Sequence, residues 1–264
     1  MYPFNYVRPT SVAEAVAALD GGNFLSGGMT LLPSLKMRLA RPETLVDLSG
    51  IAALTGITVE AGSISIGAMT RHSEVARSAV VQREVPALAE LAGGIGDPLV
   101  RNRGTIGGSI ANSDPSADYP AAVVGLGATI VTDRREISAD KFFTGLFSTA
   151  LQPGELVTRI RFPIVRRAAY AKFPSPASRY AMVGVMVVDT GKGVRVAVTG
   201  AGPCVFRLAT FEAALDKQFA PQAIDGLAVS ADGLNQDLHG TPEYRANLIS
   251  VMTRRAVTAV QARG

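Results

Sequence analysis

The sequence predicts an α+β protein with two domains, and three observations support this. The chain has 264 residues, which exceeds one average domain, and 47% of them are hydrophobic, enough to build sizeable cores. Helical and strand patterns are interspersed up to Pro163, whereas beyond it three strand patterns follow one another before helices return. We therefore expect a domain boundary near residues 164–168.

The first 50 residues predict a compact unit of helices and short strands. Ser11 and Glu14 form the pattern of a capping box, and an apolar stripe from Val12 to Leu19 predicts the helix that follows. A glycine pair at 21–22 ends this helix. The remaining expected elements of this unit are a strand at 23–25, a turn at 26–28, a helical segment at 31–39 and a strand at 44–48.

A longer mixed region follows, interrupted by a stretch rich in glycine. Six glycines occur between Gly93 and Gly108, and we expect a long shaped loop there because no regular element of that length tolerates so many. The other elements expected in this region are a strand from 63, helices at 70–77 and 85–91, a small-residue helix after Pro120, a strand at 128–132 and a strand within 154–163.

The last hundred residues predict a sheet covered by helices. Strand patterns at 170–173, 181–189 and 194–199 are separated by turn residues, which is typical of consecutive strands. Helical patterns follow and end in a long helix, for which Thr241 supplies the cap and Pro242 the first position.

Composition excludes several classes of protein. The net charge is +4, and Lys and Arg occur singly or in pairs, without the basic run of a nucleic-acid-binding arm. Cys204 is the one cysteine, so neither a disulfide nor a four-thiolate cluster can form within this chain. The N-terminus lacks the pattern of a secretory signal, and the most apolar stretch, 121–131, is about half of a membrane span. We expect a soluble, cytoplasmic protein.

Two glycine loops are candidates for ligand binding. In the first, residues 25–32, a pair of glycines follows a strand, and the backbone amides after it could converge on a diphosphate. On this stretch alone, however, a turn without a binding function is the favoured interpretation. In the second, residues 101–109, the amides of 107–109 and the hydroxyls of Thr105 and Ser109 could meet phosphate or sugar oxygens. Asp118, close behind, could accept from a hydroxyl, and this combination of polar residues favours a functional loop.

Other candidate motifs are weak. Gly200 and Gly202 imitate the start of a dinucleotide fingerprint, but Val205 stands where the third glycine belongs, so we interpret the segment as a structural turn beside a packing Cys204. His72 and His239 lie far apart without a nucleophile or a metal motif, and His72 is interpreted as a helix-start or surface residue. The sequence therefore does not show the set of catalytic residues that a hydrolase needs.

Five segments, taken in order, carry a family resemblance. They are 26–33 (SGGMTLLP), 100–111 (VRNRGTIGGSIA), 115–120 (PSADYP), 153–157 (PGELV) and 170–173 (YAKF). Together they resemble the FAD-binding medium subunit of molybdenum hydroxylases, the family of xanthine dehydrogenase and carbon monoxide dehydrogenase. The resemblance covers essentially the whole chain and reverses the preference for a plain turn in the first loop.

The resemblance implies a fold and a set of FAD-binding residues. The fold is a two-lobed FAD-binding domain of the vanillyl-alcohol-oxidase (PCMH) type at 1–165, with lobes of about 1–55 and 56–165, followed by a C-terminal domain of a small antiparallel sheet with helices at 166–264. The first loop would hold the pyrophosphate, and 105–109 the diphosphate and ribityl chain. The implied cofactor-binding residues are Leu25, Ser26, Gly27, Gly28, Met29, Thr30, Leu31, Leu32, Ile95, Thr105, Ile106, Gly107, Gly108, Ser109, Asp118, Val157, Lys172 and Tyr180.

Individual positions depart from the family pattern. Asn112 stands where many relatives have His, and Ser109 replaces an Asp or Asn of some members. Neither loop offers a His or Cys placed to attach FAD covalently, so the resemblance implies reversible binding.

The resemblance also implies a division of labour among subunits. Substrate would be hydroxylated at a molybdenum cofactor in a large subunit, and electrons would cross [2Fe–2S] clusters in a small subunit before they reach FAD in this chain. The acceptor is NAD⁺, a quinone, oxygen or another carrier, and the assembly is a heterotrimer, commonly doubled. A freestanding nucleotide-binding or regulatory module and a self-sufficient flavin enzyme are the alternative hypotheses.

Overall fold

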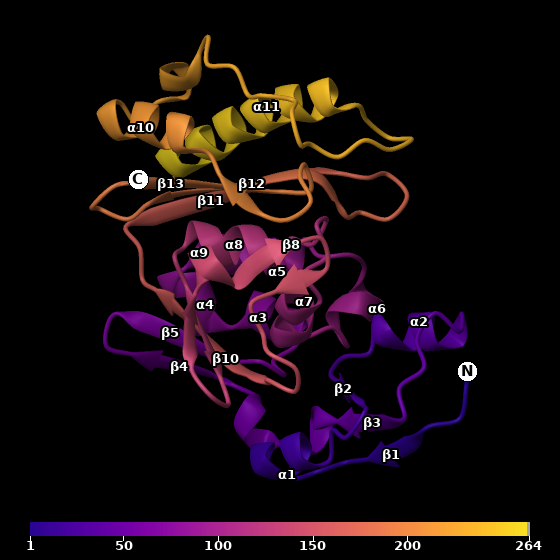
Figure 1. Cartoon of the computed structure of the whole chain (residues 1–264). Helices are drawn as coiled ribbons and strands as arrows, with labels where there is room; N and C mark the ends of the chain where they lie inside the picture. Colours follow the sequence, from indigo (N-terminus) through magenta and orange to yellow (C-terminus); the bar gives the residue numbers. More distant parts are fainter. Residues whose placement is uncertain (263–264) are drawn as a thin grey trace.

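The computed structural model describes residues 1–262 and shows an elongated molecule of stacked layers (Figure 1). The N-terminal lobe lies at one end, a lobe of a mixed sheet and helices occupies the middle, and a second sheet carries the C-terminal helices at the other end. Predictions of an α+β fold with a C-terminal antiparallel sheet are confirmed. Within the described residues, no helix is both long and apolar enough to cross a membrane.

The N-terminal lobe is built on a three-stranded parallel sheet with strand order β1-β3-β2. Its elements are β1 (Asn5–Val7), α1 (Val12–Ala17), β2 (Asn23–Leu25), α2 (Leu31–Lys36), β3 (Thr44–Asp47), η1 (Leu48–Gly50) and η2 (Ala52–Leu54). Ser11 caps α1 as predicted, but the Glu14 carboxylate accepts from Thr10 rather than from the cap residue. Helix α2 stops short of the predicted Leu39 because Arg38 has a left-handed backbone, with φ of 59°.

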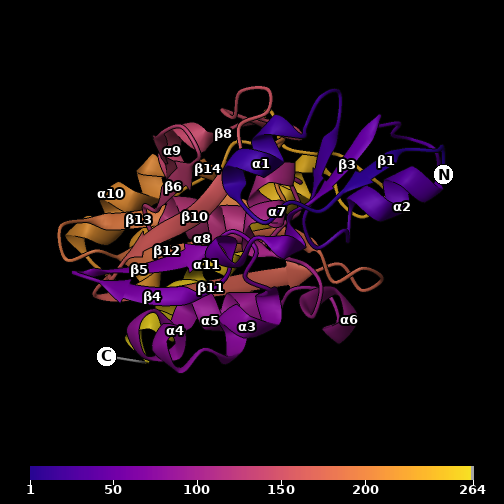
Figure 2. The ribbon, with the colours of Figure 1, turned by 90° about the horizontal axis from the view of Figure 1, so that it is seen from below.

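The middle lobe carries a five-stranded antiparallel sheet with strand order β4-β5-β10-β6-β7. Its strands are β4 (Ile57–Glu60), β5 (Ser63–Gly67), β6 (Thr129–Thr132), β7 (Glu136–Ser138) and β10 (Val157–Pro163). β8 (Phe143–Gly145) and β9 (Ser148–Thr149) form a separate two-stranded hairpin. Its helices are α3 (His72–Arg77), α4 (Ala79–Glu84), α5 (Pro86–Gly93), α6 (Pro98–Arg101), α7 (Ile106–Asn112), α8 (Tyr119–Gly125) and α9 (Ala139–Phe142). Seen from below, the N-terminal lobe is displaced to one side of this sheet (Figure 2).

The glycine-rich stretch from 93 to 108 is not the unbroken loop that its composition predicts. Asp97 accepts from the amides of Leu99 and Val100, and Pro98 occupies the first helical position, so the short helix α6 forms inside the stretch. Thr105 caps α7, which takes up the last glycines. The prediction was wrong because local capping outweighs the low helix propensity of glycine here.

The C-terminal sheet is antiparallel, with strand order β11-β12-β13-β14. Its elements are β11 (Arg167–Pro174), β12 (Ala181–Asp189), β13 (Val194–Thr199) and β14 (Phe206–Arg207), followed by α10 (Ala209–Lys217), η3 (Pro221–Ile224) and α11 (Pro242–Gln261). Thr241 and Pro242 begin α11 as predicted. All residues of β12 are buried, because α11 covers one face of the strand and α8 contacts the other.

Alternation along β12 divides its side chains between two cores. Val183, Val185 and Val187 belong to the core under α11. Met186 and Val188 belong instead to the core of the middle lobe, which continues across the predicted boundary near residue 165. Helix α8 lies so close to β12 that a Cβ on Gly125 would approach Met186 Cγ to 2.6 Å. The C-terminal sheet is thus packed directly on the helices that carry the candidate site.

Candidate functional site

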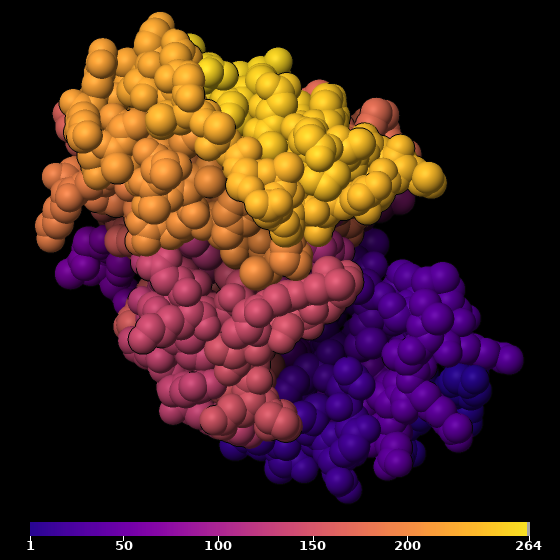
Figure 3. Space-filling view, turned by 45° about the horizontal axis from the view of Figure 1, so that its top comes forward, coloured from indigo at the N-terminus to yellow at the C-terminus, as the bar shows by residue number. Residues whose placement is uncertain are grey.

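A cavity of about 600 Å³ lies between the N-terminal lobe and the middle lobe. Figure 3 shows a hollow between the indigo and purple N-terminal segments and the magenta segments of the middle lobe. The β2–α2 loop, the start of α7 and the loop that joins β11 to β12 all contribute to its lining. Its volume falls within the range of about 300 to 1,000 Å³ that is usual for ligand sites.

Most residues singled out from the sequence surround this cavity. Those that line it are Ser26, Gly27, Gly28, Met29, Thr30, Leu31, Ile95, Thr105, Gly107, Gly108, Ser109, Asp118, Val157 and Tyr180. Leu25, Leu32, Ile106 and Lys172 are not part of the lining. Leu25 ends β2, Leu32 packs under Gly28, Ile106 is fully buried, and Lys172 lies behind Asp118.

The first glycine loop presents a run of free backbone amides. Within residues 1–262, the N–H groups of Gly27, Gly28, Met29 and Thr30 have no hydrogen-bond partner in the protein. Gly28 has φ of +75°, in the left-handed region that favours glycine. Consecutive amides that point away from the fold form a concave donor surface suited to an anion.

The two glycine loops are in direct contact. The Ser26 and Thr105 hydroxyl oxygens are 2.5 Å apart. A Cβ on Gly27 would come within 2.2 Å of the Arg103 carbonyl oxygen, so only glycine permits this approach. The loops therefore form one wall of the cavity rather than two separate sites.

The second loop differs from its expected role in one respect. The amides of 107–109 were predicted to meet phosphate or sugar oxygens, but all three already donate within the protein. Gly107 donates to the Ala68 carbonyl at 2.8 Å, Gly108 to Thr105 Oγ1 at 3.2 Å and Ser109 to the Thr105 carbonyl at 3.0 Å. The prediction was wrong for these amides because they belong to the first turn of α7. Thr105 and Ser109 hydroxyls and the surface of Gly108 remain at the cavity.

Asp118 is a buried carboxylate at the cavity, held from behind by the C-terminal sheet. Tyr170 Oη donates to its Oδ1 at 2.6 Å, and Lys172 Nζ donates to its Oδ2 at 3.1 Å. Lys172 also donates to the Gly94 carbonyl at 2.9 Å. Burial raises the pKa of Asp118, while Lys172 and Tyr170 oppose this rise.

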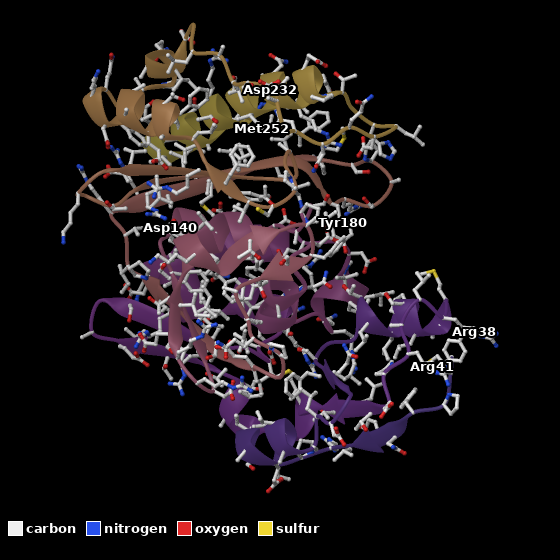
Figure 4. The ribbon with its side chains drawn as sticks, in the orientation of Figure 1. Arg38, Arg41, Asp140, Tyr180, Asp232 and Met252 are labelled. Carbon is white, nitrogen blue, oxygen red and sulfur yellow. The ribbon has the colours of Figure 1, made fainter. Side chains whose placement is uncertain are left out.

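Val157 and Tyr180 bring apolar surface to the cavity from the middle lobe and from the C-terminal sheet. Val157 is buried at the start of β10, where a bulge lies between it and Arg159. Tyr180 is 46% exposed and follows Arg179, which has φ of 61°. Figure 4 shows Tyr180 at the edge of the C-terminal sheet, on the side of the molecule where α6 lies. Burial, and then the charge of Asp114, raise the pKa of Tyr180.

Two ionisable residues that were not predicted to bind the cofactor, His72 and Glu155, also line the cavity. His72 begins α3, as predicted, but it is 4% exposed rather than at the surface. Burial and the nearby Arg101 charge lower its pKa to about 4, so the imidazole is neutral at pH 7. Glu155 is held by Arg135 at 2.9 Å, and this bond lowers its pKa to about 2. Glu155 lies in the PGELV segment, but nothing in the sequence predicts its bond to Arg135 or the burial of His72, because long-range packing determines both environments.

The segment at 200–204 is a turn, as predicted. Gly200 has φ of +83°, and a Cβ there would lie 2.4 Å from the Ala181 carbonyl oxygen. Cys204 beside it is half-buried, and burial raises the pKa of its thiol. Among the described residues, His, Cys, Asp and Glu side chains form no group of three that could hold a metal ion.

The donor set of the cavity fits a flavin dinucleotide. Free amides in the first loop suit a diphosphate, Asp118 can accept from a hydroxyl, and the apolar surfaces of Val157 and Tyr180 suit a ring system. Close packing at Gly27 keeps side chains out of the place where the two loops meet.

Known proteins resemble this chain over almost its whole length. The sequence profile of the FAD binding domain in molybdopterin dehydrogenase matches residues 2–165. The carbon monoxide dehydrogenase medium chain of Hydrogenophaga pseudoflava is 37% identical over 98% of both chains. The glyceraldehyde dehydrogenase medium chain of Sulfolobus acidocaldarius is 32% identical over 98% of this chain and all of that protein. In the solved structure of reconstituted CO dehydrogenase from Oligotropha carboxidovorans, the matching chain superposes with a TM-score of 0.92 at 34% identity, covering 100% of this chain and 99% of that one.

Proposed function

This chain belongs to the family of FAD-binding medium subunits of molybdopterin-dependent dehydrogenases, and from that premise we propose how it binds FAD and what it does with it. The observation that carries the proposal is the cavity wall made by the two interlocked glycine loops, with four free amides in the first loop. A purely structural turn has no need for a run of unsatisfied amides beside a cavity of this size.

We assign the diphosphate of FAD to the first loop. The amides of Gly27, Gly28, Met29 and Thr30 would donate to its oxygens, and the surface of Gly108 would allow its close approach. Since the amides of 107–109 are occupied, the second loop would contribute through the hydroxyls of Thr105 and Ser109 instead.

The remaining parts of the cofactor fit the deeper and rim positions of the cavity. Asp118 would accept from a ribityl hydroxyl, Ile95 and Val157 would contact the ring system, and Tyr180 would cover it from the rim. Lys172 would act through Asp118, because it bonds this carboxylate and does not line the cavity. Since neither glycine loop carries a His or Cys that could attach FAD covalently, binding would be reversible.

FAD, when bound, supplies redox chemistry that can accept and release electrons one or two at a time, whereas the protein supplies binding and orientation. We propose that the subunit takes electrons from [2Fe–2S] clusters of a small subunit and delivers them to an external acceptor. The molybdenum cofactor would lie in a large subunit, and the complete assembly would be a dimer of heterotrimers. The names of the relatives as medium chains support an assembly of this kind.

We also propose that the chain divides at residue 165, into an FAD-binding domain of two lobes (1–55 and 56–165) and a C-terminal domain (166–264). The extent of the matched profile supports the first of these units. The C-terminal domain would then contribute Lys172 and Tyr180 to the site.

The experiment is to purify the chain, or the complex that copurifies with it, and to record its absorption spectrum before and after incubation with FAD. Flavin absorption bands at about 370 and 450 nm are expected. A matched titration with ATP distinguishes a general nucleotide-binding module, which would bind ATP and not FAD. If no flavin is retained even after reconstitution, the proposal fails.

A further inference from the structure

Two side chains of strand β11 reach across the boundary of the C-terminal sheet to the carboxylate of Asp118. Ala168, Tyr170 and Lys172 alternate with Ala171 and Phe173 along the strand, so the first three face the middle lobe and the other two face α11. Tyr170 Oη lies 2.6 Å from Asp118 Oδ1, and this contact joins residues 52 positions apart in the sequence.

The neighbouring strand makes room for Tyr170. Gly184 in β12 lies opposite Lys172 in the register of the sheet. A Cβ on Gly184 would come within 2.1 Å of Tyr170 Oη and 2.8 Å of Tyr170 Cζ. Gly184 has no positive φ, so its lack of a side chain serves the position of the Tyr170 ring rather than a turn.

The two bonds leave Asp118 with accepting capacity toward the cavity. A carboxylate offers about four lone-pair positions. Tyr170 takes one on Oδ1, and Lys172 Nζ, which lies 3.1 Å from Oδ2 and 3.0 Å from Oδ1, takes no more than one on each oxygen, so a position on Oδ2 remains.

The other ionisable groups around Asp118 are Tyr119, which follows it in α8, Tyr180, from the loop after β11, and Asp114, which lines the same cavity and has a pKa raised by burial. Burial and the charge of Asp118 raise the pKa of Tyr119, and burial and the charges of Asp114 and Asp118 raise that of Tyr180. Neither tyrosine adds a positive charge, so Lys172 is the cation that balances Asp118 among the described residues.

We propose that Tyr170 is a positioning residue, which fixes the orientation of Asp118 so that this carboxylate accepts a hydrogen bond from a hydroxyl of the cofactor. The proposal rests on the proposed function, because it takes FAD as the ligand. It adds to that function a residue that does not touch the cavity and comes from outside the domain that the FAD-binding profile matches.

The pKa of Asp118 distinguishes the two possible roles of Tyr170, because it would not change if Tyr170 served only in packing. Burial raises the pKa of Asp118, and the Tyr170 hydroxyl is one of the two groups that oppose this rise. Removing the hydroxyl should raise the pKa further. If FAD binding needs the ionised carboxylate, FAD affinity falls as the pH falls through the pKa of Asp118. In the Tyr170→Phe protein this loss of affinity should begin at a higher pH than in the parent protein.

The test is a set of FAD titrations, followed by the quenching of flavin fluorescence from pH 5 to 9, on the full chain after removal of its FAD. For Tyr170→Phe we expect about fivefold to tenfold weaker binding at neutral pH, because the Asp118 carboxylate that would bind the cofactor is then less firmly oriented and less fully ionised. We also expect a midpoint of the pH dependence at higher pH. Tyr119→Phe is the matched control, since Tyr119 follows Asp118 in the chain, is fully buried, and has a hydroxyl with no partner among the described residues.

Asp118→Asn separates this inference from the proposed function. If Asp118→Asn leaves FAD affinity unchanged, the assignment of Asp118 to the cofactor fails. If Asp118→Asn weakens binding but Tyr170→Phe keeps the parent affinity and pH midpoint, only the role of Tyr170 is overturned.

If Tyr170→Phe does not fold, the Gly184→Ala variant provides a second test. Gly184→Ala displaces the Tyr170 ring without removing its hydroxyl, and it should shift the pH midpoint in the same direction. In the Asp118→Asn background, Gly184→Ala should cause no further shift. A parent-like midpoint in the Gly184→Ala protein would overturn the proposal by this route.

Discussion

The hydroxyl oxygens of Ser26 and Thr105 lie 2.5 Å apart, so one hydrogen bond joins two loops separated by 79 positions in the sequence. Ser26 follows strand β2 of the N-terminal lobe, whereas Thr105 caps helix α7 of the middle lobe. The bond therefore sets the distance between the lobes where the cofactor is proposed to bind. Any change in that distance would move the free amides of the first loop relative to Asp118.

A double-mutant cycle of Ser26→Ala and Thr105→Val should reveal this coupling. Thr105→Val also removes the cap of α7 and should lower the free energy of unfolding by about 1 kcal/mol, with a smaller loss for Ser26→Ala. The interaction term in the free energy of FAD binding should be about 0.5 to 1.5 kcal/mol. Isothermal titration with FAD measures it, with the exposed Ser230→Ala as the control. Strictly additive effects would mean that the bond does not hold the loops together.

Gly28→Ala and Gly62→Ala form a pair that separates backbone strain from the cofactor site. Gly28 has φ of +75° and a Cβ would meet Leu32 Cδ1 at 2.8 Å, whereas Gly62 has φ of +73° and open space around it. Both changes should cost about 1 kcal/mol of folding free energy for the left-handed backbone. Only Gly28→Ala should also weaken FAD binding, by about tenfold, because the free amides lie on either side of it. Urea unfolding and FAD titration of both proteins check this, and an equal loss of affinity would contradict it.

Gly107 and Gly108 are adjacent but should respond differently to alanine. A Cβ on Gly107 would lie 2.5 Å from Ala68 Cβ and 2.7 Å from its carbonyl oxygen, inside the packed core. Gly107→Ala should therefore destabilise the protein by about 1 to 3 kcal/mol with or without FAD. A Cβ on Gly108 would meet Thr105 Oγ1 at 3.0 Å and Ser26 Oγ at 3.3 Å, so Gly108→Ala should act mainly on FAD retention. Thermal melting of the FAD-free and FAD-bound forms distinguishes these outcomes.

Buried His72 predicts a loss of stability at mildly acidic pH. Its folded pKa of about 4 lies below the model-peptide value of 6.5, so the unfolded chain binds a proton first as the pH falls. The free energy of unfolding should be highest above pH 6.5 and should fall between pH 6.5 and 4. His72→Leu should flatten this part of the profile in urea unfolding series, with the exposed His239→Leu as the control. A slope unchanged by His72→Leu would show that other groups cause it.

The low pKa of Glu155 predicts a second loss of folding stability, at a lower pH than the loss caused by His72. Its bond to Arg135 lowers its pKa to about 2 from the ordinary 4.5, so its contribution to stability is complete above pH 4.5 and disappears as the pH falls toward 2. Glu155→Gln should lower the free energy of unfolding at pH 7 by about 2 kcal/mol, since a charged hydrogen bond is lost. The deficit should shrink at pH 2 to 3. Because Glu155 also lies at the cavity, FAD affinity of the variant should be measured at the same time.

Elements with strong local signals were predictable from the sequence. The apolar run of β12 and the cap of α11 at Thr241 and Pro242 depend on neighbouring residues alone, and both occur where they were expected. Short strands such as β1 escaped prediction, since Asn5–Val7 is exposed and becomes a strand only by pairing with Thr44–Asp47. Pairings of that kind leave no periodic pattern in a three-residue segment.

The candidate site was predictable in its residue types but not in its hydrogen bonds. Glycines and hydroxyls marked both loops, yet the Gly107 amide is taken by Ala68, which lies far away in the sequence. The burial of His72 depends on packing against Tyr119, with ring centroids 5.2 Å apart. Contacts between residues far apart in the sequence are set by tertiary packing, and local propensity does not predict them.

Shared packing across residue 165 limits how the chain can be shortened. Met186 and Val188 of β12 belong to the same core as the helices of the middle lobe, and Tyr170 and Lys172 complete the bonds of Asp118. A polypeptide cut after residue 165 would present the apolar surface of α8 to water and leave a buried carboxylate without its cation. Expression of the N-terminal region alone should therefore yield aggregated protein, and the C-terminal sheet serves as a structural support without which the FAD-binding region does not fold.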